Sequence, residues 1–590
     1  MHQAIKALLS LLIISAAAHA DPVLGQSAPS LPAIPRRILP GRDELRSPVP
    51  EQPLPPQPSG RVESSQAIQP GPCPLESSDI VTDITEVKFT GPKGAPLSQE
   101  IAAILRDVGG VGPGQPIKVV CDIRDRANAA LRRARYVASA QIPIQRIENG
   151  QIRLEVVTAR IVEMRVRGNP GPYEQQLANI IEKLKAIDPL SEEEAEKLLL
   201  FAGDMPGLDV QLALMPAGGE QGNLIGNLTV NYVPMSVLGN IQNYNSRLLG
   251  RETAYLRTEF YGLTSAADVT YADFSSAFIN HNQTVVEAGH QMAVDYRGTA
   301  IAARGTYALS RPDVGTLQFK TKSLILGVEM SRPLLRSVLI NAGIVGGFEY
   351  SQQRTTLSAS GISTPLNLDK ISALFVRFTG EARELTWTQD EAYRIFGSLE
   401  LRKGLDILGA TTTGEVTDGG YFPSRFEGNA QATILRGQTN ASLALLPWLG
   451  VAGEFRGQWA NTPLLNFDEF SIGNLTIGRG YDPGSNSGDR AAGGSFELHV
   501  KAITNARLKL DFFGFYDAVR LWNLDRNSTE ADRRLRSFGG GLRLGLRSTA
   551  LLELTYARPL DPVLSIDRRR APDRLLLSLT AQFVPFGMYH

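Results

Sequence analysis

Apolar and polar residues alternate in short segments from Ser236 to the end of the chain, and no helical periodicity interrupts them. Alternation with a period of two is typical of a β-strand that turns one apolar face to its surroundings. In Leu576–Phe583, for example, one face is apolar throughout. We therefore predict sixteen strands, each about as long as a tilted strand that crosses a bilayer. The predicted strands are residues 236–244, 254–263, 267–275, 284–294, 298–309, 319–333, 337–352, 368–384, 391–403, 424–437, 446–460, 495–503, 507–520, 534–547, 549–559 and 573–583.

An even number of antiparallel strands can close into a transmembrane β-barrel whose two ends lie on the same side of the membrane. A soluble β-sandwich produces the same alternation when its apolar faces meet in a core, and it stays the alternative. The strand pattern runs unbroken through 355 residues, which favours the barrel. Closure also satisfies every backbone polar group in lipid. We expect a transmembrane β-barrel of 16 antiparallel strands over residues 236–590.

Two units of mixed helix and strand precede the barrel, and both follow the order strand, helix, helix, strand, strand. Residues 79–159 form the first unit and residues 160–235 the second. Asn149-Gly150 is a strong hairpin signal in the first unit, and Ser191 opens a capping box in the second. The predicted elements are Ile84–Phe89, Leu97–Leu105, Val120–Tyr136, Gln141–Ile147 and Ile152–Val157, then Val162–Arg167, Tyr173–Ala186, Ser191–Ala202, Leu208–Leu214 and Leu228–Val233.

The amino-terminal segment carries an export signal. Residues 1–20 combine a lysine, an apolar run and the small-residue site Ala18-His19-Ala20, which is typical of a signal peptide. No later stretch is apolar for long enough to form a transmembrane helix. Residues 21–78 are Pro-rich and poor in apolar residues, as in an extended linker. Within the linker, Gly41 to Arg46 is compatible with a short helix, and whether residues 21–50 plug the barrel stays open.

Composition excludes several classes of function. Sixty basic and sixty acidic residues cancel, so no basic surplus favours a nucleic acid as partner. The two cysteines, Cys73 and Cys121, belong to an exported chain, where a disulfide is favoured over two buried thiols. Cysteines and histidines show no metal-ligand spacing, so we expect no metal site and no cofactor. No Gly-x-Ser-x-Gly or His-Glu-x-x-His motif indicates an enzyme.

One stretch, Asp468 to Leu498, contains seven glycines between two strand-like segments and is predicted to be a long loop. Arg479 stands between Gly478 and Gly480, which allow close backbone approach, and Tyr481 follows. A solvated loop whose arginine contacts only water is the simpler interpretation. The strands beyond the loop favour another one, because their alternation places Glu497 and Asp517 on one polar face. The arginine could then reach both carboxylates if residues 468–494 fold inward.

Three motifs resemble those of a known family. Phe470–Gly473, Gly478–Tyr481 and Ser487–Arg490 are similar to the sixth extracellular loop of two-partner secretion transporters, with Gly478 in place of the usual valine of their Val-Arg-Gly-Tyr/Phe motif. Asp517 resembles the aspartate of the Phe-x-Asp element on the thirteenth strand. Tyr136-Val137-Ala138-Ser139 resembles the end of the second helix of the first polypeptide-transport-associated (POTRA) domain, with Arg135 in place of the usual glycine.

The resemblance implies a 16-stranded barrel in the outer membrane of a Gram-negative bacterium, preceded by two α+β POTRA domains in the periplasm. The barrel would export a large hemolysin- or adhesin-like client, unfolded in transit. Arg479, Gly480 and Tyr481, with Asp517 and Glu497, would form a latch for the inward loop. Further expected partners are outer-membrane lipid and the barrel-assembly machinery, which would recognise the aromatic residue Phe583 or Phe586.

Client recognition is expected at strand edges within residues 80–235, where an extended polypeptide can add itself as a strand. Tyr136, Ile142 and Ile144 are the candidate contacts. Alternatively, these domains act only as spacers. Two other functions stay open, namely a barrel-assembly factor of the same superfamily and a passive porin or receptor in which Arg479 would be a pore-lining charge.

Overall fold

The computed structural model describes most of the chain from Leu39 to Phe583. The described residues are 39–45, 62–63, 67–68, 71–78, 80–109, 114–147, 149–295, 297–314, 317–359, 362–385, 391–505, 507–526, 528–546 and 549–583. The predicted signal peptide, residues 1–20, and Phe586 lie outside them.

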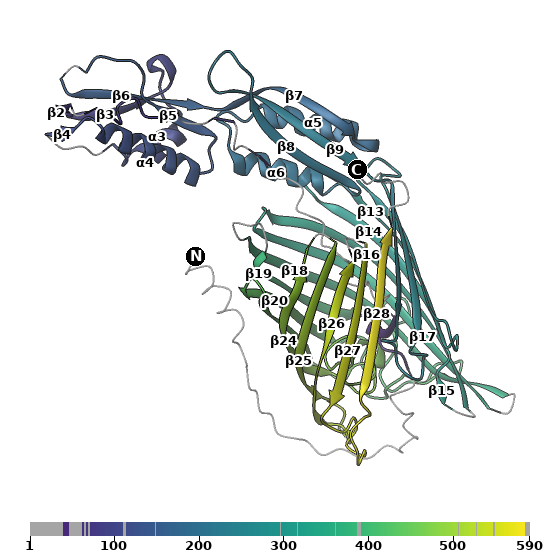
Figure 1. Ribbon diagram of the computed structural model, residues 1–590. Helices are drawn as coiled ribbons and strands as arrows, with labels where there is room; N and C mark the ends of the chain where they lie inside the picture. Colours follow the sequence, from purple (N-terminus) through teal and green to yellow (C-terminus); the bar gives the residue numbers. More distant parts are fainter. Residues whose placement is uncertain are drawn as a thin grey trace. The chain divides into compact units, whose positions relative to one another are not determined.

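Sixteen long antiparallel strands close into a barrel, so the predicted strand number and fold class are confirmed (Figure 1). The barrel strands are β10 (Met235–Gln242), β11 (Thr253–Tyr261), β12 (Val269–Ala277), β13 (Gln283–Ala293), β14 (Ala300–Ser310), β16 (Leu317–Arg336), β17 (Ile340–Ala359), β18 (Ile362–Leu385), β19 (Glu391–Leu405), β20 (Thr433–Leu446), β21 (Leu449–Ala460), β24 (Arg490–Thr504), β25 (Leu508–Trp522), β26 (Asp532–Leu546), β27 (Ala550–Pro559) and β28 (Arg574–Phe583). A two-residue strand, β15 (Asp313–Val314), adds to β16. The first and last strands pair with each other from Val237↔Phe583 to Gln242↔Ser578.

Alternation along the strands turns apolar side chains outward and polar ones inward. On β28, Leu577 and Leu579 are 40% and 43% exposed, whereas Thr580 is 2% exposed. A soluble sandwich would bury its leucines and expose its threonines. The observed arrangement is that of a barrel with an apolar outer band and a polar interior. Among the described residues, no helix has the length and apolar character needed to span a bilayer.

One strand prediction is wrong over much of its length. Residues 424–432 form a loop, and β20 begins only at Thr433. The apolar alternation of this segment was misleading because Arg425 is drawn into a buried cluster of carboxylates inside the barrel. Asn429 also donates its backbone N–H to Pro463, which ties the segment to the neighbouring loop.

The first amino-terminal domain packs α3 and α4 against a three-stranded sheet of order β3-β6-β5. Ile123, Ala127 and Leu131 of α4 are fully buried. The strand predicted at 141–147 is wrong, since β5 ends at Gln141 and the chain then leaves the sheet. Pro143 explains this, because proline has no N–H for the ladder. The elements are β2 (Val81–Thr82), β3 (Glu86–Thr90), η1 (Pro92–Gly94), α3 (Gln99–Leu105), β4 (Gln115–Pro116), α4 (Val119–Arg133), β5 (Ala138–Gln141) and β6 (Gln151–Thr158).

The second domain repeats this plan with a sheet of order β1-β8-β9-β7. Ser191 caps α6 by accepting a hydrogen bond from the backbone N–H of Glu194 at 3.4 Å. Its elements are β7 (Arg160–Asn169), η2 (Gly171–Tyr173), α5 (Glu174–Lys185), α6 (Glu192–Gly203), β8 (Leu208–Pro216) and β9 (Asn223–Tyr232). The linker supplies its edge strand β1 (Val62–Glu63), which runs parallel to β8. Ala67 of the linker is buried in the same core.

A disulfide joins Cys73 to Cys121 at the start of α4. It ties the end of the linker to the helix that carries much of the first domain's core. Arg124 strengthens the same connection by donating to the carbonyl of Gly71 at 3.0 Å.

Replacing both Cys73 and Cys121 by alanine should lower the free energy of unfolding of the first domain by about 2–4 kcal/mol, because the unfolded chain loses a cross-link. Pulse proteolysis of the full chain, with and without reductant, would measure the loss. Equal protection of residues 80–158 in the variant and the wild type would contradict this expectation.

Candidate functional site

The loop between β21 and β24 lies against the inner wall of the barrel. It contains η3 (Asn466–Asp468), β22 (Phe470–Ser471) and β23 (Ser487–Gly488). Its apolar side chains are buried against residues of β25 and β26 rather than exposed: Phe470, Ile472, Ile477 and Tyr481 pack with Val519, Leu521 and Leu535. The wall strand β24 begins at Arg490, so the loop ends at Asp489 and not at residue 494 as predicted.

In the structure Arg479 contacts both Glu497 and Asp517, the two carboxylates that strand alternation places on one polar face. The Arg479 backbone N–H donates to Asp517 at 2.8 Å, and its guanidinium donates to the same carboxylate at 3.1 Å. The guanidinium also donates to Glu497 at 2.7 Å and to the Ser495 hydroxyl at 2.6 Å. It lies 3.6 Å above the centre of the Phe515 ring. Asp517 is on β25, the thirteenth long strand of the barrel.

Burial makes this ion pair stronger than one in water. The Asp517 and Glu497 side chains are 1% and 9% exposed, and that of Arg479 is 19% exposed. Burial acts to lower the pKa of Arg479, but Asp517 and Glu497 outweigh it and raise the pKa. A shielded, multiply bonded pair of this kind contributes a few kcal/mol, about 1–3, against less than 1 on a surface. The wall supports it further, because Arg543 donates to Glu497 at 2.6 Å.

The residues that flank Arg479 are constrained by close contacts with the barrel wall and by the backbone conformation of the loop. A side chain on Gly480 would come within 2.8 Å of the Ser537 Cβ and 2.9 Å of the Pro559 nitrogen. Gly478 has φ of 105°, a conformation that glycine adopts without strain. Tyr481 is completely buried and donates its hydroxyl to the carbonyl of Arg536 at 2.8 Å. The Gly-Arg-Gly-Tyr motif therefore lets the loop pack closely against the barrel wall and also supplies the arginine of the ion pair.

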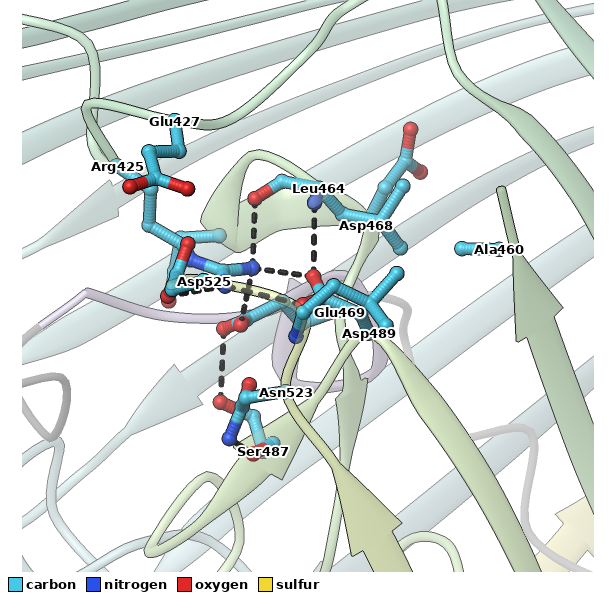
Figure 2. A network of polar contacts seen from close by, with 12 residues as sticks. Arg425, Glu427, Ala460, Leu464, Asp468, Glu469, Ser487, Asp489, Asn523 and Asp525 are labelled. Carbon is cyan, nitrogen blue, oxygen red and sulfur yellow. Dashed lines mark hydrogen bonds and ion pairs between the residues drawn. The ribbon is translucent and has the colours of Figure 1, made fainter. Parts of the chain in front are cut away.

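A second arginine holds the two ends of the loop, and no sequence pattern indicated it. Arg425 pairs with Asp489 at the end of the loop and with Glu469 near its start, the latter at 2.7 Å (Figure 2). It also pairs with Asp525 at 2.5 Å. Asp489 accepts the backbone N–H groups of Leu464 and Leu524, each at 2.7 Å. Burial acts to lower the pKa of Arg425, but these carboxylates outweigh it and raise the pKa.

A third cluster joins the short helix α2 (Arg42–Leu45) to the barrel and the loop. Arg42 donates to Glu349 of β17 at 2.5 Å and to Asp468 at the start of the loop at 2.8 Å. Arg402 of β19 pairs with the same Glu349 at 2.9 Å. The Arg42 side chain is 5% exposed, so α2 lies inside the barrel. The only hint of this contact in the sequence was the possible short helix at residues 41–46 of the linker.

Polar interior space remains beside these clusters. A cavity of about 470 Å³ is lined by six arginines and six carboxylates. These residues are Arg42, Arg257, Arg304, Arg377, Arg436, Arg456, Asp43, Asp273, Glu287, Glu329, Glu400 and Glu469. Such a lining favours water and charged or polar polypeptide over lipid. Across the described ranges, no group of histidine, cysteine and acidic residues could hold a metal ion.

The three candidate client-binding residues occupy different places in the first domain. Ile144 is fully exposed, and Ile142 packs partly against the core. Both follow β5, which is an edge strand. Tyr136 instead lies half-buried at the joint between the domains, where its backbone bridges to Ser191. The structure therefore does not bring Tyr136 onto the exposed segment that carries Ile144.

Comparisons with known proteins agree with this geometry. A family model described as "Haemolysin secretion/activation protein ShlB/FhaC/HecB" matches residues 229–544. CdiB from Escherichia coli is similar in structure, with a TM-score of 0.65 and 15% identity, covering 88% of this chain and 93% of that one. CdiB from Acinetobacter baumannii has a TM-score of 0.58 and 15% identity, covering 92% and 95%.

BamA from Haemophilus ducreyi lacking POTRA domains 1–3 has a TM-score of 0.50 and 13% identity, covering 85% of this chain and 100% of that one. At these identities the structural likeness shows the fold, which is a barrel preceded by POTRA-like domains. The search of curated proteins found no match.

The contact of α2 with the barrel should depend on pH through Glu44. Burial raises the pKa of its carboxyl to about 7, from an ordinary 4.5, and the nearby Asp43 and Asp482 add to the shift. The released segment ionises first as pH rises, so Glu44 favours docking below pH 4.5, and this contribution is lost by about pH 7. Labelling of a Leu39→Cys variant by a membrane-impermeant thiol reagent should therefore increase from pH 5 to pH 8.

The same labelling in a Leu39→Cys, Glu44→Gln variant measures the pH dependence of the reagent itself. The ratio of the two rates should rise by up to about tenfold per pH unit in this window. A ratio that stays constant would show that Glu44 does not control the docking of α2.

Proposed function

Because this chain belongs to the haemolysin secretion/activation family ShlB/FhaC/HecB, and is thus a two-partner secretion transporter with an outer-membrane barrel, we propose that it exports one large hemolysin- or adhesin-like protein. The observation that carries the proposal is the Arg479 cluster, which seats a long loop inside a polar barrel. The amino-terminal domains would lie in the periplasm, where the unfolded client arrives. The barrel termini at Met235 and Phe583 lie at one end of the barrel, which would then be the periplasmic end.

The interior offers a route only if α2 leaves. Arg42 pairs with Glu349 and Asp468, but each of these carboxylates also pairs with another arginine. Glu349 also pairs with Arg304 at 3.0 Å and with Arg402 at 2.9 Å, while Asp468 pairs with Arg436 at 3.2 Å. Removal of Arg42 would leave no buried carboxylate unpaired, which avoids the largest penalty of breaking a buried ion pair. This redundancy supports α2 as a removable plug.

The ion pair that holds the inward loop differs, because Asp517 lacks a second arginine partner among the described residues. Apart from Arg479, Asp517 accepts from the Ser537 hydroxyl at 3.2 Å, and no second arginine pairs with it among the described residues. We therefore assign the loop a fixed position during export, held by Arg479, with the client passing through the space that α2 occupies. The cavity beside α2 supports this route, because its lining combines both charges.

Client recognition would begin at the segment after β5. Ile144 exposes its whole side chain just beyond the edge strand β5, which suits contact with an extended polypeptide that adds as a strand. The corresponding edge of the second domain, β8, is already covered by the linker strand β1. The first domain is therefore the better candidate for the initial contact.

Alanine at Arg479 or at Asp517 should reduce export about tenfold. The first change leaves the buried Asp517 carboxylate without its arginine, and the second leaves Arg479 held by Glu497 and Ser495 alone, so both loosen the loop. Secretion of the cognate client is the readout, and heat-modifiable migration on gels would show that the barrel still assembles. The matched control is Arg520→Ala, since Arg520 lies on the same strand but pairs with Asp532 on the exposed surface. Full export by both loop variants would remove the latch from the mechanism.

Aspartate at Ile144 should weaken client binding to the purified transporter by about tenfold, since it places a charge where an apolar contact is proposed. Ile80→Asp is the control, because Ile80 is also exposed in the first domain, at 62%. Binding of the client's amino-terminal region can be measured by surface plasmon resonance. Equal affinities for wild type and Ile144→Asp would place recognition elsewhere, and no client binding by the wild type would contradict the proposed function itself.

A further inference from the structure

Four cations share one patch on the outer face of the barrel, on β16, β17 and β18. Thr321 and Thr355 are fully buried and hydrogen-bond to each other inside the wall, at 3.0 Å. Because side chains alternate along a strand, their neighbours point outward. Lys320, Lys322 and Arg354 are exposed accordingly, and Lys370 is half-buried. We call Lys320, Lys322, Arg354 and Lys370 the basic patch.

The register places these cations close together. Lys322 lies directly opposite Arg354, and Lys370 lies opposite Gln352, two residues from Arg354. Side chains directly opposite have Cβ atoms about 5 Å apart, and diagonal neighbours about 7–8 Å. Lys320 is two residues from Lys322 on the same face. The four side chains can thus converge on a single small anionic group, or on two adjacent ones.

An apolar band ends immediately beside the basic patch. The outward residues of β16 run Met330, Val328, Leu326 and Leu324 toward Lys322, and the first three are 57%, 53% and 46% exposed. The equivalent residues on β18 are Phe378, Val376 and Leu374, at 51%, 40% and 51%. Such exposed apolar side chains mark the height of the lipid acyl chains. The cations therefore lie at the level of lipid headgroups.

The basic patch has no counter-charge within the described part of the protein. Cations directly opposite each other on neighbouring strands destabilise a sheet. At two other such pairs of the barrel, Arg383↔Arg394 and Arg520↔Arg534, one member holds a carboxylate: Arg394 pairs with Glu381 at 2.7 Å and Arg520 with Asp532 at 2.5 Å. None of the four cations of the patch forms an ion pair with a described residue.

The carboxylate next to Lys370 on its own strand does not face the patch. Asp369 belongs to the same strand as Lys370 but is buried on the inner face, where it accepts the backbone N–H of Ser424 at 2.9 Å. The Tyr421 ring lies 5.4 Å from the Arg354 guanidinium carbon and holds that side chain over the outer face. Four cations that form no ion pair with a described residue therefore meet at the edge of the apolar band.

We propose that the basic patch binds the phosphate groups of a phosphorylated lipid in the membrane leaflet that surrounds this end of the barrel. The inference rests on the proposed function for the orientation, because the patch lies at the end away from Met235 and Phe583, and hence in the outer leaflet. The lipid's acyl chains lie along Leu324, Leu326 and Leu374, while Lys322 and Arg354 contact its phosphates. Charge and apolar surface adjoin here, which suits a lipid better than a free anion.

Lipopolysaccharide is the probe that tests the proposal, because its phosphates sit directly above several acyl chains. We expect it to bind the purified wild-type protein in detergent about 25-fold more tightly than the Lys322→Ala, Arg354→Ala variant, since each of the two cations near such a surface contributes roughly fivefold. Native mass spectrometry and the shift of the melting temperature on lipid addition would measure this. The Lys322→Arg, Arg354→Lys variant, which keeps both charges, should bind like the wild type.

Two comparisons make the test specific. Arg568→Ala, Arg569→Ala removes two exposed cations from the loop before β28, at the same end of the barrel, and should leave the affinity unchanged. Inorganic phosphate at equal concentration should not stabilise the protein, whereas equal stabilisation by it would identify a free-anion site and overturn the proposal. Equal loss of affinity in the Arg568, Arg569 variant, or none in the Lys322, Arg354 variant, would also overturn it. Fractionation of the protein outside the outer membrane would contradict the proposed function instead.

Discussion

A charged side chain inside the barrel is stable only when an opposite charge from another part of the chain neutralises it. Burying an unpaired ion costs several kcal/mol, about as much as a large share of a domain's stability. In this protein the rule decides where the long loop lies. Arg479 reaches Asp517 and Glu497 on the wall, and Arg425 reaches Glu469 and Asp489 at the two ends of the loop. The loop is thereby fixed at its centre and at both ends.

The same rule distinguishes a fixed element from a removable one. Among the described residues Asp517 pairs with Arg479 alone, so displacement of the loop would leave a buried carboxylate without an ion pair. Glu349 and Asp468 have other arginines besides Arg42, so α2 can leave while both stay paired. On the outer face the situation is reversed, because the cations of the basic patch form no ion pair with a described residue, and we propose that phosphate groups of the membrane neutralise them. The need to neutralise charge thus applies to the inward loop, to α2 and to the basic patch on the outer face.

Sequence alone indicated most of the barrel, because alternation with a period of two is a local property. The same alternation placed Glu497 and Asp517 on one face, which is why their proximity to Arg479 could be anticipated. Arg425 and Arg42 could not be anticipated in this way, since their partners lie up to 100 residues and up to 426 residues away along the chain, respectively. The errors also have local causes. Apolar alternation persists through 424–432 although a buried ion cluster holds that segment, and Pro143 ends a strand that the pattern continued.

The most direct test of the account is whether position 479 contacts position 517 in the native membrane. Arg479→Cys combined with Asp517→Cys should be joined by a short thiol-specific cross-linker in intact outer membranes, because the apolar contacts of Ile472, Ile477 and Tyr481 with the wall keep the loop in place when the ion pair is removed. Arg479→Cys with Asp511→Cys is the matched control, because Asp511 lies on the same face of β25, six residues or about 20 Å away. The account predicts cross-linking of the first pair alone. Cross-linking of both pairs, of the control pair only, or of neither would show that the loop does not lie where Arg479 would hold it.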